Sequence, residues 1–364
     1  MYFNNLKIKL SGIKTIILCL LFLNILSISC IFSSLHQGGE FIGKTLLIKQ
    51  IIWITISWIF LIFFTFINYR VYSNFAYIIY FANIFLLLGV LIFGKTVMGA
   101  QRWISLFGFT FQPSELSKLS IIILLSHIFS LKGQKNFLNS FVFPIILTVL
   151  NALLIFKQPD LGTSLILIFL FLGIGLFSKT NKMYFIGLII LGLIISPFAL
   201  NSLKDYQKKR LTVFLNPNID PLGSGYTIIQ SKIAIGSGKL IGKGFLAGTQ
   251  NQFNFLPERH TDFIVTIIAE EWGFIGIIFL LWIYWLILKK ILSKASKLRD
   301  QFAYYLCLGI SFLFFSHIFI NIGMTLGILP VVGLPLIFLS YGGTNLLLNS
   351  ISMGIFFNIC RTQR

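Results

Sequence analysis

The sequence predicts an all-α, polytopic integral membrane protein with ten transmembrane helices and one large extracytoplasmic loop. Of its 364 residues, 57% are hydrophobic, 11% are charged and 40 are phenylalanine, a composition that excludes a soluble domain. The apolar residues gather in successive runs that are long enough to cross a bilayer as helices. These runs are continuously apolar and do not alternate with polar residues, which disfavours membrane-spanning strands.

Ten such runs follow one another along the chain. The first of them resembles a signal peptide, because lysines precede it and it ends near Cys30. The residues before Cys30 are a poor cleavage site and the run continues past the cysteine, so a retained first helix is favoured. The runs cover about 15–35, 46–68, 75–94, 113–131, 141–156, 161–178, 183–200, 263–288, 302–322 and 334–359.

The fifth and sixth runs leave one choice of topology open, because only residues 157–160 separate them. They form either a hairpin of two spans or one kinked span. A hairpin places 15 lysines and arginines on the N-terminal side and five in the opposite short loops, whereas a kinked span gives six and 13. Cytoplasmic loops carry the excess of basic residues, so we expect a hairpin with both termini in the cytoplasm. The long segment at about 201–262 then lies outside. Loops of this length cross the membrane regardless of charge, so its basic residues do not bear on the orientation.

Two further classes of function are excluded. The four cysteines are scattered without C-x-x-C spacing, which indicates neither a disulfide framework nor a zinc site. The formal charge of +19 is spread between the spans and is not gathered on one domain. In a membrane protein such an excess reports topology and contact with anionic lipid, so no nucleic-acid partner is expected.

The acidic residues lie almost entirely on the expected outer side. Charge inside a membrane segment is costly and tends to mark function, so we expect any chemistry to be extracytoplasmic. Only Asp300 is expected in the cytoplasm. Six acids fall in outer loops and three in the outer parts of spans: Glu40, Asp160, Asp205, Asp220, Glu258 and Asp262, then Glu115, Glu270 and Glu271.

Asp262 is the first candidate for chemistry, because it lies where the outer loop enters the eighth span, in the stretch FLPERHTDF. An acid at a helix N-terminus also serves as a cap or interacts with the helix dipole, and capping does not exclude catalysis. Glu270 and Glu271 follow inside the same span. We expect them to contact other helices instead of lipid, with structural polar contacts as the favoured role.

Other polar groups suggest binding sites as well as structural roles. Glu115 and Lys118 are three residues apart near the start of the fourth span, so they share a helix face and can form an ion pair. The pair is either structural or lines a polar cavity. The Gln158-Pro159-Asp160 sequence indicates a tight outer turn, and Arg102 with its neighbouring tryptophan fits an interfacial anchor.

The long outer segment is rich in glycine and basic residues between positions 220 and 250. Its GSGK sequence looks like part of a phosphate loop, but the pattern fails. For the Gly-Lys pair at 242–243, Ser237 stands where glycine is needed and Gly244 where serine or threonine is needed. Backbone amides and basic side chains in such a loop suit an anionic head group, and a merely flexible loop is the alternative.

In these residues the sequence resembles the SEDS family (shape, elongation, division and sporulation), in particular its RodA branch. The likeness runs along nearly the whole chain as an ordered series of motifs. They are GAQRWI at 99–104, FQPSELSK at 111–118, QPDLGTS at 158–164, FLNPNIDPLGSGY at 214–226, AIGSGKLIGKGFLAGTQ at 234–250, FLPERHTDFI at 255–264, AEEWGFIG at 269–276 and LPLIFLSYGG at 334–343.

The resemblance implies a peptidoglycan glycosyltransferase of the bacterial cytoplasmic (inner) membrane, formed by residues 1–364 as one SEDS membrane domain. Such proteins polymerise lipid II, an undecaprenyl-pyrophosphate-linked disaccharide-peptide. They work in the elongation machinery with a class B penicillin-binding protein that crosslinks the product. The family's essential aspartate matches Asp262. Trp272 departs from the family pattern by replacing a usual leucine.

The chemistry that the resemblance implies needs a base and cations. The donor bond is α and the product bond is β, so a single displacement needs a base on the acceptor 4-hydroxyl and stabilisation of the departing pyrophosphate. We expect Asp262 to be the base and Arg210 and Lys243 to be the cations, with a divalent ion such as Mg²⁺ or Mn²⁺ as helper or substitute. Further substrate contacts are expected from Glu115, Lys118, Arg102 and Asp160.

Two other classes of function stay open at this point. A lipid II flippase or transporter would place its main polar groups near the midplane, often in repeated halves with broken helices. The sequence has no convincing internal repeat, and its acids cluster at the outer face. A non-catalytic scaffold for the crosslinking partner would leave Asp262 dispensable.

Overall fold

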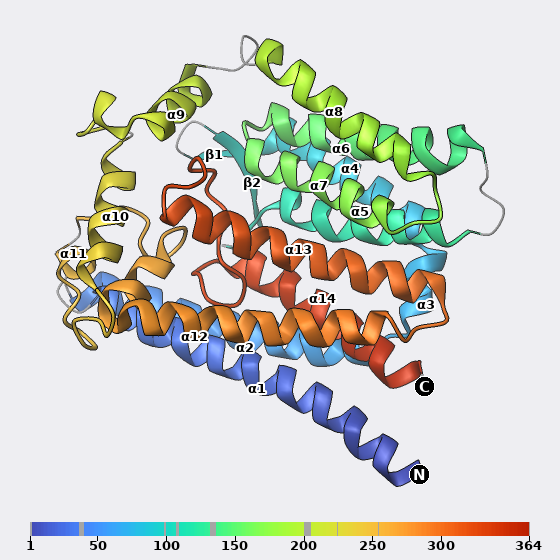
Figure 1. Cartoon of the computed structure of the whole chain (residues 1–364), viewed down its shortest axis with the longest axis horizontal. Coiled ribbons are helices and arrows are strands. Elements are labelled where there is room, and N and C mark those ends of the chain that lie inside the picture. The colour runs from blue at the N-terminus through green and yellow to red at the C-terminus, as the bar shows by residue number, and fades with distance from the viewer. Residues whose placement is uncertain are drawn as a thin grey trace. The chain divides into compact units, whose positions relative to one another are not determined.

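The fold is known from a computed structural model that describes most of the chain (Figure 1). Among the described residues, one helix corresponds to each of the ten predicted spans. The description covers residues 2–35, 40–97, 100–106, 109–131, 136–199, 205–223, 225–253 and 255–363. The ten helices are α1 (Tyr2–Leu35), α2 (Glu40–Phe66), α4 (Ala76–Phe93), α5 (Pro113–Ser130), α6 (Phe143–Lys157), α7 (Leu161–Leu176), α8 (Lys182–Ala199), α12 (Ile264–Ala295), α13 (Gln301–Thr325) and α14 (Gly343–Thr362).

Six segments of the described chain are long and apolar enough to cross a membrane. Their mean hydropathy lies between 1.9 and 2.6. Large apolar side chains remain exposed along these helices, for example Phe63 on α2 and Phe85 on α4. Soluble proteins rarely expose apolar surfaces of this extent to water, whereas lipid covers them in a bilayer. The predicted class, a helical polytopic membrane protein, is confirmed. The six segments are Gly12–Leu35, Thr45–Phe66, Ala76–Phe93, Leu138–Lys157, Ile264–Ala295 and Gln301–Thr325.

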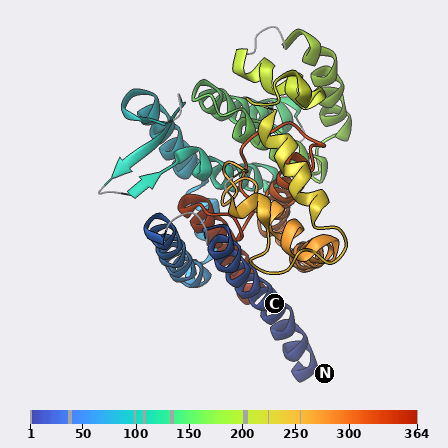
Figure 2. The same cartoon turned by 90° about the vertical axis from the view of Figure 1, so that its left-hand side faces the viewer.

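The stretch between α4 and α5 forms a small antiparallel sheet that was not predicted. Strands β1 (Lys95–Val97), β2 (Ala100–Leu106) and β3 (Phe109–Phe111) pair in that order, and Figure 2 shows them as adjacent arrows. Ile104 pairs with Phe111 across the β2–β3 ladder. Hydropathy runs identify spans only, while the β-branched and aromatic residues of this connection favour strands.

The last predicted span begins later than expected. Residues 331–342 are not helical, and α14 begins at Gly343, so the predicted start at 334 was wrong. Pro335 supplies no backbone donor, and Gly333 adopts a φ of +71°. This segment is held instead by Ser340, whose Oγ accepts from Leu336 N at 2.8 Å. An apolar run predicts burial, and burial alone does not make a helix.

The long segment between α8 and α12 contains helices and is not merely a flexible loop; we call it the outer segment because it is predicted to lie outside. Its described residues, 205–223, 225–253 and 255–262, include four short helices: α9 (Asp205–Leu215), the 3₁₀ helix η3 (Pro217–Ile219), α10 (Tyr226–Ser237) and α11 (Thr249–Gln252). Ser231 of α10 donates from Oγ to the carbonyl of Thr325 in α13. Shorter elements elsewhere are α3 (Tyr69–Asn74) and the π-helical turn η1 (Leu138–Val142).

Helix α12 is interrupted at Gly273, where the backbone has a φ of +64°. The carbonyls of Glu270 and Glu271 accept from the backbone N–H groups of Lys243 (3.0 Å) and Gly244 (2.9 Å). Beyond the interruption, Phe274 N and Ile275 N donate to the carbonyls of residues 239 and 240 at 2.9 and 3.1 Å. The outer segment thus supplies the backbone hydrogen bonds that the helix loses, which a membrane environment requires.

The chain divides into two compact units, and each is described separately. The first unit comprises Met1–Thr55, Gly192–Ile287 and His317–Leu346. The second comprises Ile56–Leu191, Leu288–Ser316 and Leu347–Arg364. Residues from distant parts of the sequence therefore meet within each unit. The assignment of residues 1–364 to a single SEDS domain stays a prediction.

Candidate functional site

Asp262 occupies the junction between the outer segment and α12, two residues before the helix begins at Ile264. It is half-buried. A Cβ added to Gly333 would lie 3.3 Å from Asp262 Oδ2, so the carboxylate lies against the backbone of the 331–342 segment. The predicted place of this carboxylate at a loop–helix junction is confirmed, and its catalytic role stays a prediction.

The segment His260–Asp262, which we call the aspartate segment, is held by hydrogen bonds to its three successive backbone carbonyls. The carbonyl of His260 accepts from Tyr341 N at 2.9 Å, and that of Thr261 accepts from Ser340 Oγ at 2.5 Å. The carbonyl of Asp262 accepts from Asn321 Nδ2 at 2.8 Å. The sequence prediction missed these donors, although a lone asparagine inside an apolar span is a signal that could have drawn attention to it.

Two basic side chains precede Asp262 and are partly shielded from water. Arg259 donates from Nε to the carbonyl of Ser34 at 3.1 Å, and burial lowers the pKa of its guanidinium. The ring of His260 packs edge-on against Tyr341 at a centroid distance of 5.9 Å. Burial lowers the pKa of His260 most, the carboxylate of Glu258 raises it and Arg259 lowers it further. Neutral imidazole is therefore the favoured form at neutral pH.

Arg210 lies exposed on α9 and reaches the same segment as Asp262. Its guanidinium nitrogen NH1 donates to the carbonyl of Val331 at 3.2 Å. Val331 is two residues before Gly333, which lies against the Asp262 carboxylate. The structure thus brings two of the predicted site residues to one short backbone stretch.

Lys243 is engaged in an ion pair, a contact that the sequence did not predict. Its Nζ lies 2.7 Å from Glu270 Oε1 and 3.0 Å from Thr249 Oγ1. Glu270 is fully buried and also accepts from Gln250 N at 3.0 Å and from Asn251 Nδ2 at 2.7 Å. The lysine side chain remains 29% exposed. The role of Lys243 as a pyrophosphate ligand stays a prediction.

The two glutamates of α12 were expected to contact other helices. Glu271 does so, because Ser33 of α1 donates from its hydroxyl to Glu271 Oε1. Glu270 also does so, because Gln250 N and Asn251 Nδ2 of α11 donate to its carboxylate, which in addition pairs with Lys243. Both carboxylates are buried, and both therefore make polar contacts within the protein.

In the second unit, Glu115 and Lys118 form the predicted ion pair near the start of α5. Lys118 Nζ lies 2.7 Å from Glu115 Oε1, and both side chains are buried. A buried polar cluster centres on Asn83 of α4. Its Oδ1 accepts from Ser117 Oγ at 2.8 Å and from Asn151 Nδ2 at 3.2 Å. The beginning of α5, which is a predicted membrane span, thus carries several buried polar groups.

Arg102 and the Gln158-Pro159-Asp160 turn lie together in the same unit. Arg102 of β2 donates from Nε to the carbonyl of Gln158 at 3.1 Å and from NH2 to that of Pro159. Asp160 caps α7 by accepting from Thr163 N at 3.1 Å. The predicted tight turn is confirmed. The substrate-binding roles of Arg102 and Asp160, like those of the buried ion pair in α5, stay predictions.

Clusters of metal-binding side chains are the next property of the site. Among the residues that the structure describes, no three His, Cys, Asp or Glu side chains gather to hold a metal ion. The carboxylate of Glu270 is already occupied by Lys243 and backbone amides. The helper role of a divalent ion stays a prediction.

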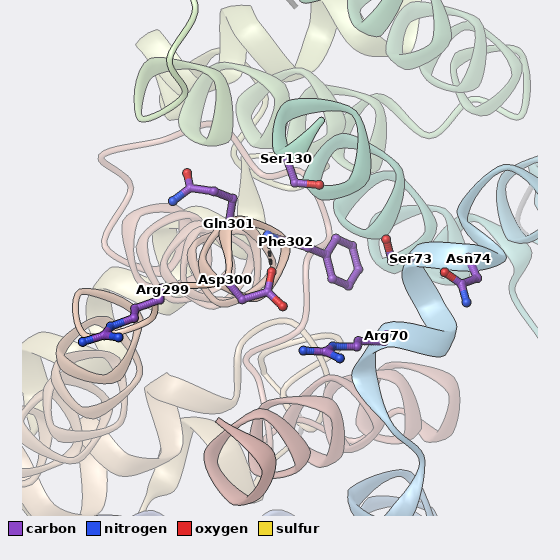
Figure 3. Close-up of a pocket in the computed structure, with 8 residues that line it drawn as sticks. All are labelled: Arg70, Ser73, Asn74, Ser130, Arg299, Asp300, Gln301 and Phe302. Carbon is purple, nitrogen blue, oxygen red and sulfur yellow. Dashed lines mark hydrogen bonds between the residues drawn. The ribbon is translucent and has the colours of Figure 1, made fainter. Parts of the chain in front are cut away.

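A cavity of about 430 Å³ in the second unit is lined by none of the predicted site residues (Figure 3). Its lining includes Arg70, Arg299 and Asp300, which fall in loops expected to be cytoplasmic. Asp300 immediately precedes α13 and accepts from Phe302 N at 3.0 Å and from Tyr69 Oη at 2.6 Å. These hydrogen bonds give the Asp300 carboxylate a structural role. We therefore keep Asp262 as the centre of the candidate site.

Comparison with known proteins gives matches along nearly the whole chain. The model of the family described as cell cycle protein (FtsW, RodA, SpoVE) matches residues 11–364. The peptidoglycan glycosyltransferase MrdB of Escherichia coli K12 is 40% identical over 291 residues, which cover 80% of this chain and 79% of that protein. The peptidoglycan glycosyltransferase RodA of Treponema pallidum is 30% identical over 96% of this chain and 97% of its own length.

Solved structures share the fold. One, described as showing how a peptidoglycan synthase complex coordinates polymerization and crosslinking, matches with a TM-score of 0.79 at 29% identity, over 94% of this chain and 96% of its own. The rod shape determining protein RodA of Thermus thermophilus matches with a TM-score of 0.68 at 25% identity, over 94% and 96%. With a family model that spans residues 11–364, the chain belongs to the FtsW, RodA and SpoVE family, which is the SEDS family that its motifs resemble.

Proposed function

We propose that this chain is a peptidoglycan glycosyltransferase that polymerises lipid II into glycan strands for cell-wall elongation and cell-shape maintenance. Relatives that carry this activity in their names are 40% and 30% identical to it over most of the chain. The observation that carries the proposal is the geometry at Asp262. A half-buried carboxylate and the guanidinium of Arg210 meet one short backbone stretch at residues 331–333.

In the proposed reaction, Asp262 is the general base. The acceptor 4-hydroxyl attacks the anomeric carbon of the donor sugar, and the bond from that carbon to the pyrophosphate oxygen breaks. The hydroxyl proton passes to the Asp262 carboxylate, and the pyrophosphate leaves with the bonding electron pair. Attack from the opposite face converts the α bond of the donor into the β bond of the product. A positioned base of this kind contributes about 10²- to 10⁴-fold to a rate.

Arg210 is the proposed main cation for the departing pyrophosphate. Its planar guanidinium presents several donors that match phosphate oxygens in two-pronged contacts. The side chain is exposed on α9 and already reaches residue 331. Lys243 is a proposed second cation that shares its amine with Glu270. Both groups would stabilise charge that develops in the transition state.

Four residues of the second unit are proposed substrate contacts. Glu115 and Lys118 form a buried ion pair inside a membrane helix, a kind of group that often marks a functional pathway. Arg102 and Asp160 meet at the Gln158-Pro159-Asp160 turn. We assign these two pairs to the binding of lipid II and of the growing strand, with the whole chain acting as one SEDS domain.

The proposed location is the bacterial cytoplasmic membrane, with both termini in the cytoplasm. The distribution of basic residues between loops supports this orientation. The proposed partner is a class B penicillin-binding protein that crosslinks the new strands within the elongation machinery. The likeness to a chain of a peptidoglycan synthase complex that couples polymerization and crosslinking supports this partnership.

The proposal is tested by lipid II turnover with purified protein in detergent. We expect wild-type protein to form glycan strands without a membrane, which a flippase or scaffold would not do. Asp262→Asn and Asp262→Ala should lower the rate by about 10²- to 10⁴-fold. Glu258→Gln is the matched control, because Glu258 is an exposed acid of the same segment that accepts from Thr261 Oγ1. Wild-type rates from well-folded Asp262→Ala protein would rule out the assigned base.

A further inference from the structure

The backbone of the aspartate segment is held by donors from two other parts of the first unit. Tyr341 N, Ser340 Oγ and Asn321 Nδ2 donate to the carbonyls of residues 260, 261 and 262 in turn. Tyr341 and Ser340 belong to the non-helical segment before α14, and Asn321 belongs to α13. Because consecutive carbonyls are fixed, the backbone at Asp262 has little freedom to move.

Asn321 is fully buried and bridges two separate backbone stretches. Its Nδ2 donates to the carbonyl of Asp262 at 2.8 Å and to that of Leu334 at 2.7 Å. Both neighbours are carbonyl oxygens, so the side-chain amide must present its NH₂ group toward them. Asn321 Oδ1 has no hydrogen-bond partner within the part of the chain that the structure describes. A buried acceptor without a partner is costly, so this asparagine requires an explanation beyond packing.

Ser340 makes a second bridge between the same two stretches. Its hydroxyl donates to the carbonyl of Thr261 and accepts from Leu336 N at 2.8 Å. Gly333 lies in the same stretch, and a Cβ added there would lie 3.3 Å from Asp262 Oδ2. The stretch from residue 333 to residue 341 and the aspartate segment are therefore joined at several points on either side of the carboxylate.

We propose that Asn321 is the main positioning residue for Asp262 and that Ser340 is a second one. This inference rests on the proposed role of Asp262 as the base. Neither side chain touches the reacting atoms. Each acts by fixing the backbone that carries the carboxylate, which sets the distance from Asp262 to the acceptor hydroxyl. A displacement of about 1 Å in such a group can lower a rate by roughly 10²-fold.

The first test replaces Asn321 with leucine, which has a similar size, lacks both donors and also removes the unpaired Oδ1. We expect kcat for lipid II polymerisation to fall by about 10- to 100-fold, with KM changed by less than about threefold. Asn358→Leu is the matched control. Asn358 is a buried asparagine of α14 that bridges Tyr69 N and the carbonyl of Thr65 in the second unit. The control should keep kcat within about threefold of wild type.

Ser340 provides a second pair of variants in case Asn321→Leu protein does not fold. Ser340→Ala removes the hydroxyl that donates to the carbonyl of Thr261, whereas Ser340→Thr keeps a hydroxyl at the same position. We expect the alanine variant to lose kcat by roughly 10-fold and the threonine variant to recover most of it. Equal kcat values for Ser340→Ala and wild type would count against the bridge.

A double-variant measurement separates positioning from general damage. If Asn321 acts only through Asp262, adding Asn321→Leu to Asp262→Asn protein should change the residual rate by less than about twofold. An additive loss in that background would overturn the inference, and so would a wild-type kcat for folded Asn321→Leu protein. Full activity of Asp262→Asn protein would instead refute the proposed base, so the two failures are distinguishable.

Discussion

Replacing Glu270 with glutamine should release the outer segment from α12. The carboxylate of Glu270 is fully buried and accepts from Lys243 Nζ, Gln250 N and Asn251 Nδ2 at 2.7, 3.0 and 2.7 Å. Glutamine has the same shape, yet it lacks the charge and turns an NH₂ group toward some of these donors. The variant therefore leaves buried donors unpaired around a neutral side chain.

The expected magnitude follows from the burial of the acceptor. Breaking a buried, hydrogen-bonded charge network costs about 3–5 kcal/mol. The Lys243 side chain is 29% exposed, so water screens its attraction to Glu270. The lower end of this energy range, about 3 kcal/mol, is therefore the better estimate. A loss of about 3 kcal/mol raises the local opening equilibrium by roughly 10²-fold, since each 1.4 kcal/mol is a factor of about ten.

Limited proteolysis of the purified protein in detergent measures this opening directly. We expect Glu270→Gln protein to be cleaved between residues 239 and 252 about 10²-fold faster than wild type, as long as closing is faster than cleavage. Lys243→Met is the informative comparison, because it removes the partner that is nearer to water and leaves the backbone donors in place. Equal cleavage rates for Glu270→Gln and wild type would show that the carboxylate does not anchor the segment.

Three other predictions concern single groups near the same site. Burial lowers the pKa of His260, so this side chain binds a proton less readily in the folded protein than in the unfolded chain. Thermal stability should therefore fall as the pH drops below about 6.5. His260→Gln should flatten this dependence between about pH 7 and 5. Gly242→Ala should lower the free energy of unfolding by more than about 1 kcal/mol, because φ is +88° and the new Cβ would clash with the carbonyl of Glu271. Gly236→Ala in α10 is the control, because its Cβ meets open space and the change should be neutral or stabilising. Arg210→Glu should lower lipid II turnover by at least about 10²-fold, and unchanged turnover would remove Arg210 from the proposed site.

Hydropathy predicted the membrane helices well, because long apolar runs have few other stable states. It failed where apolar residues are buried without being helical. The segment at 331–342 is apolar in sequence, but Gly333 and Pro335 prevent a regular helix and Ser340 supplies replacement hydrogen bonds. The interruption of α12 at Gly273 escaped prediction for a related reason, since its missing backbone partners come from residues 239–244, about 30 positions away.

The candidate site was predictable to the extent that single residues carry the signal. Asp262 could be identified as a carboxylate at a loop–helix junction, and the pairing of Glu115 with Lys118 followed from helical spacing. The pairing of Lys243 with Glu270 could not be predicted, because the two residues meet only when the outer segment folds back onto α12. Asn321 was missed for the same reason, since its two acceptors lie 59 and 13 residues away in the chain.

The contacts of Arg210 and Lys243 make them unequal as ligands for a leaving pyrophosphate. Arg210 lies exposed on α9 and donates to the carbonyl of Val331, so its guanidinium is placed to form charge-assisted hydrogen bonds to a phosphate. Lys243 would have to leave Glu270, and a buried carboxylate that loses its cation costs several kcal/mol. Arg210 is therefore the main cation for the pyrophosphate, and Lys243 is a weaker second cation that also holds the glycine-rich segment in place.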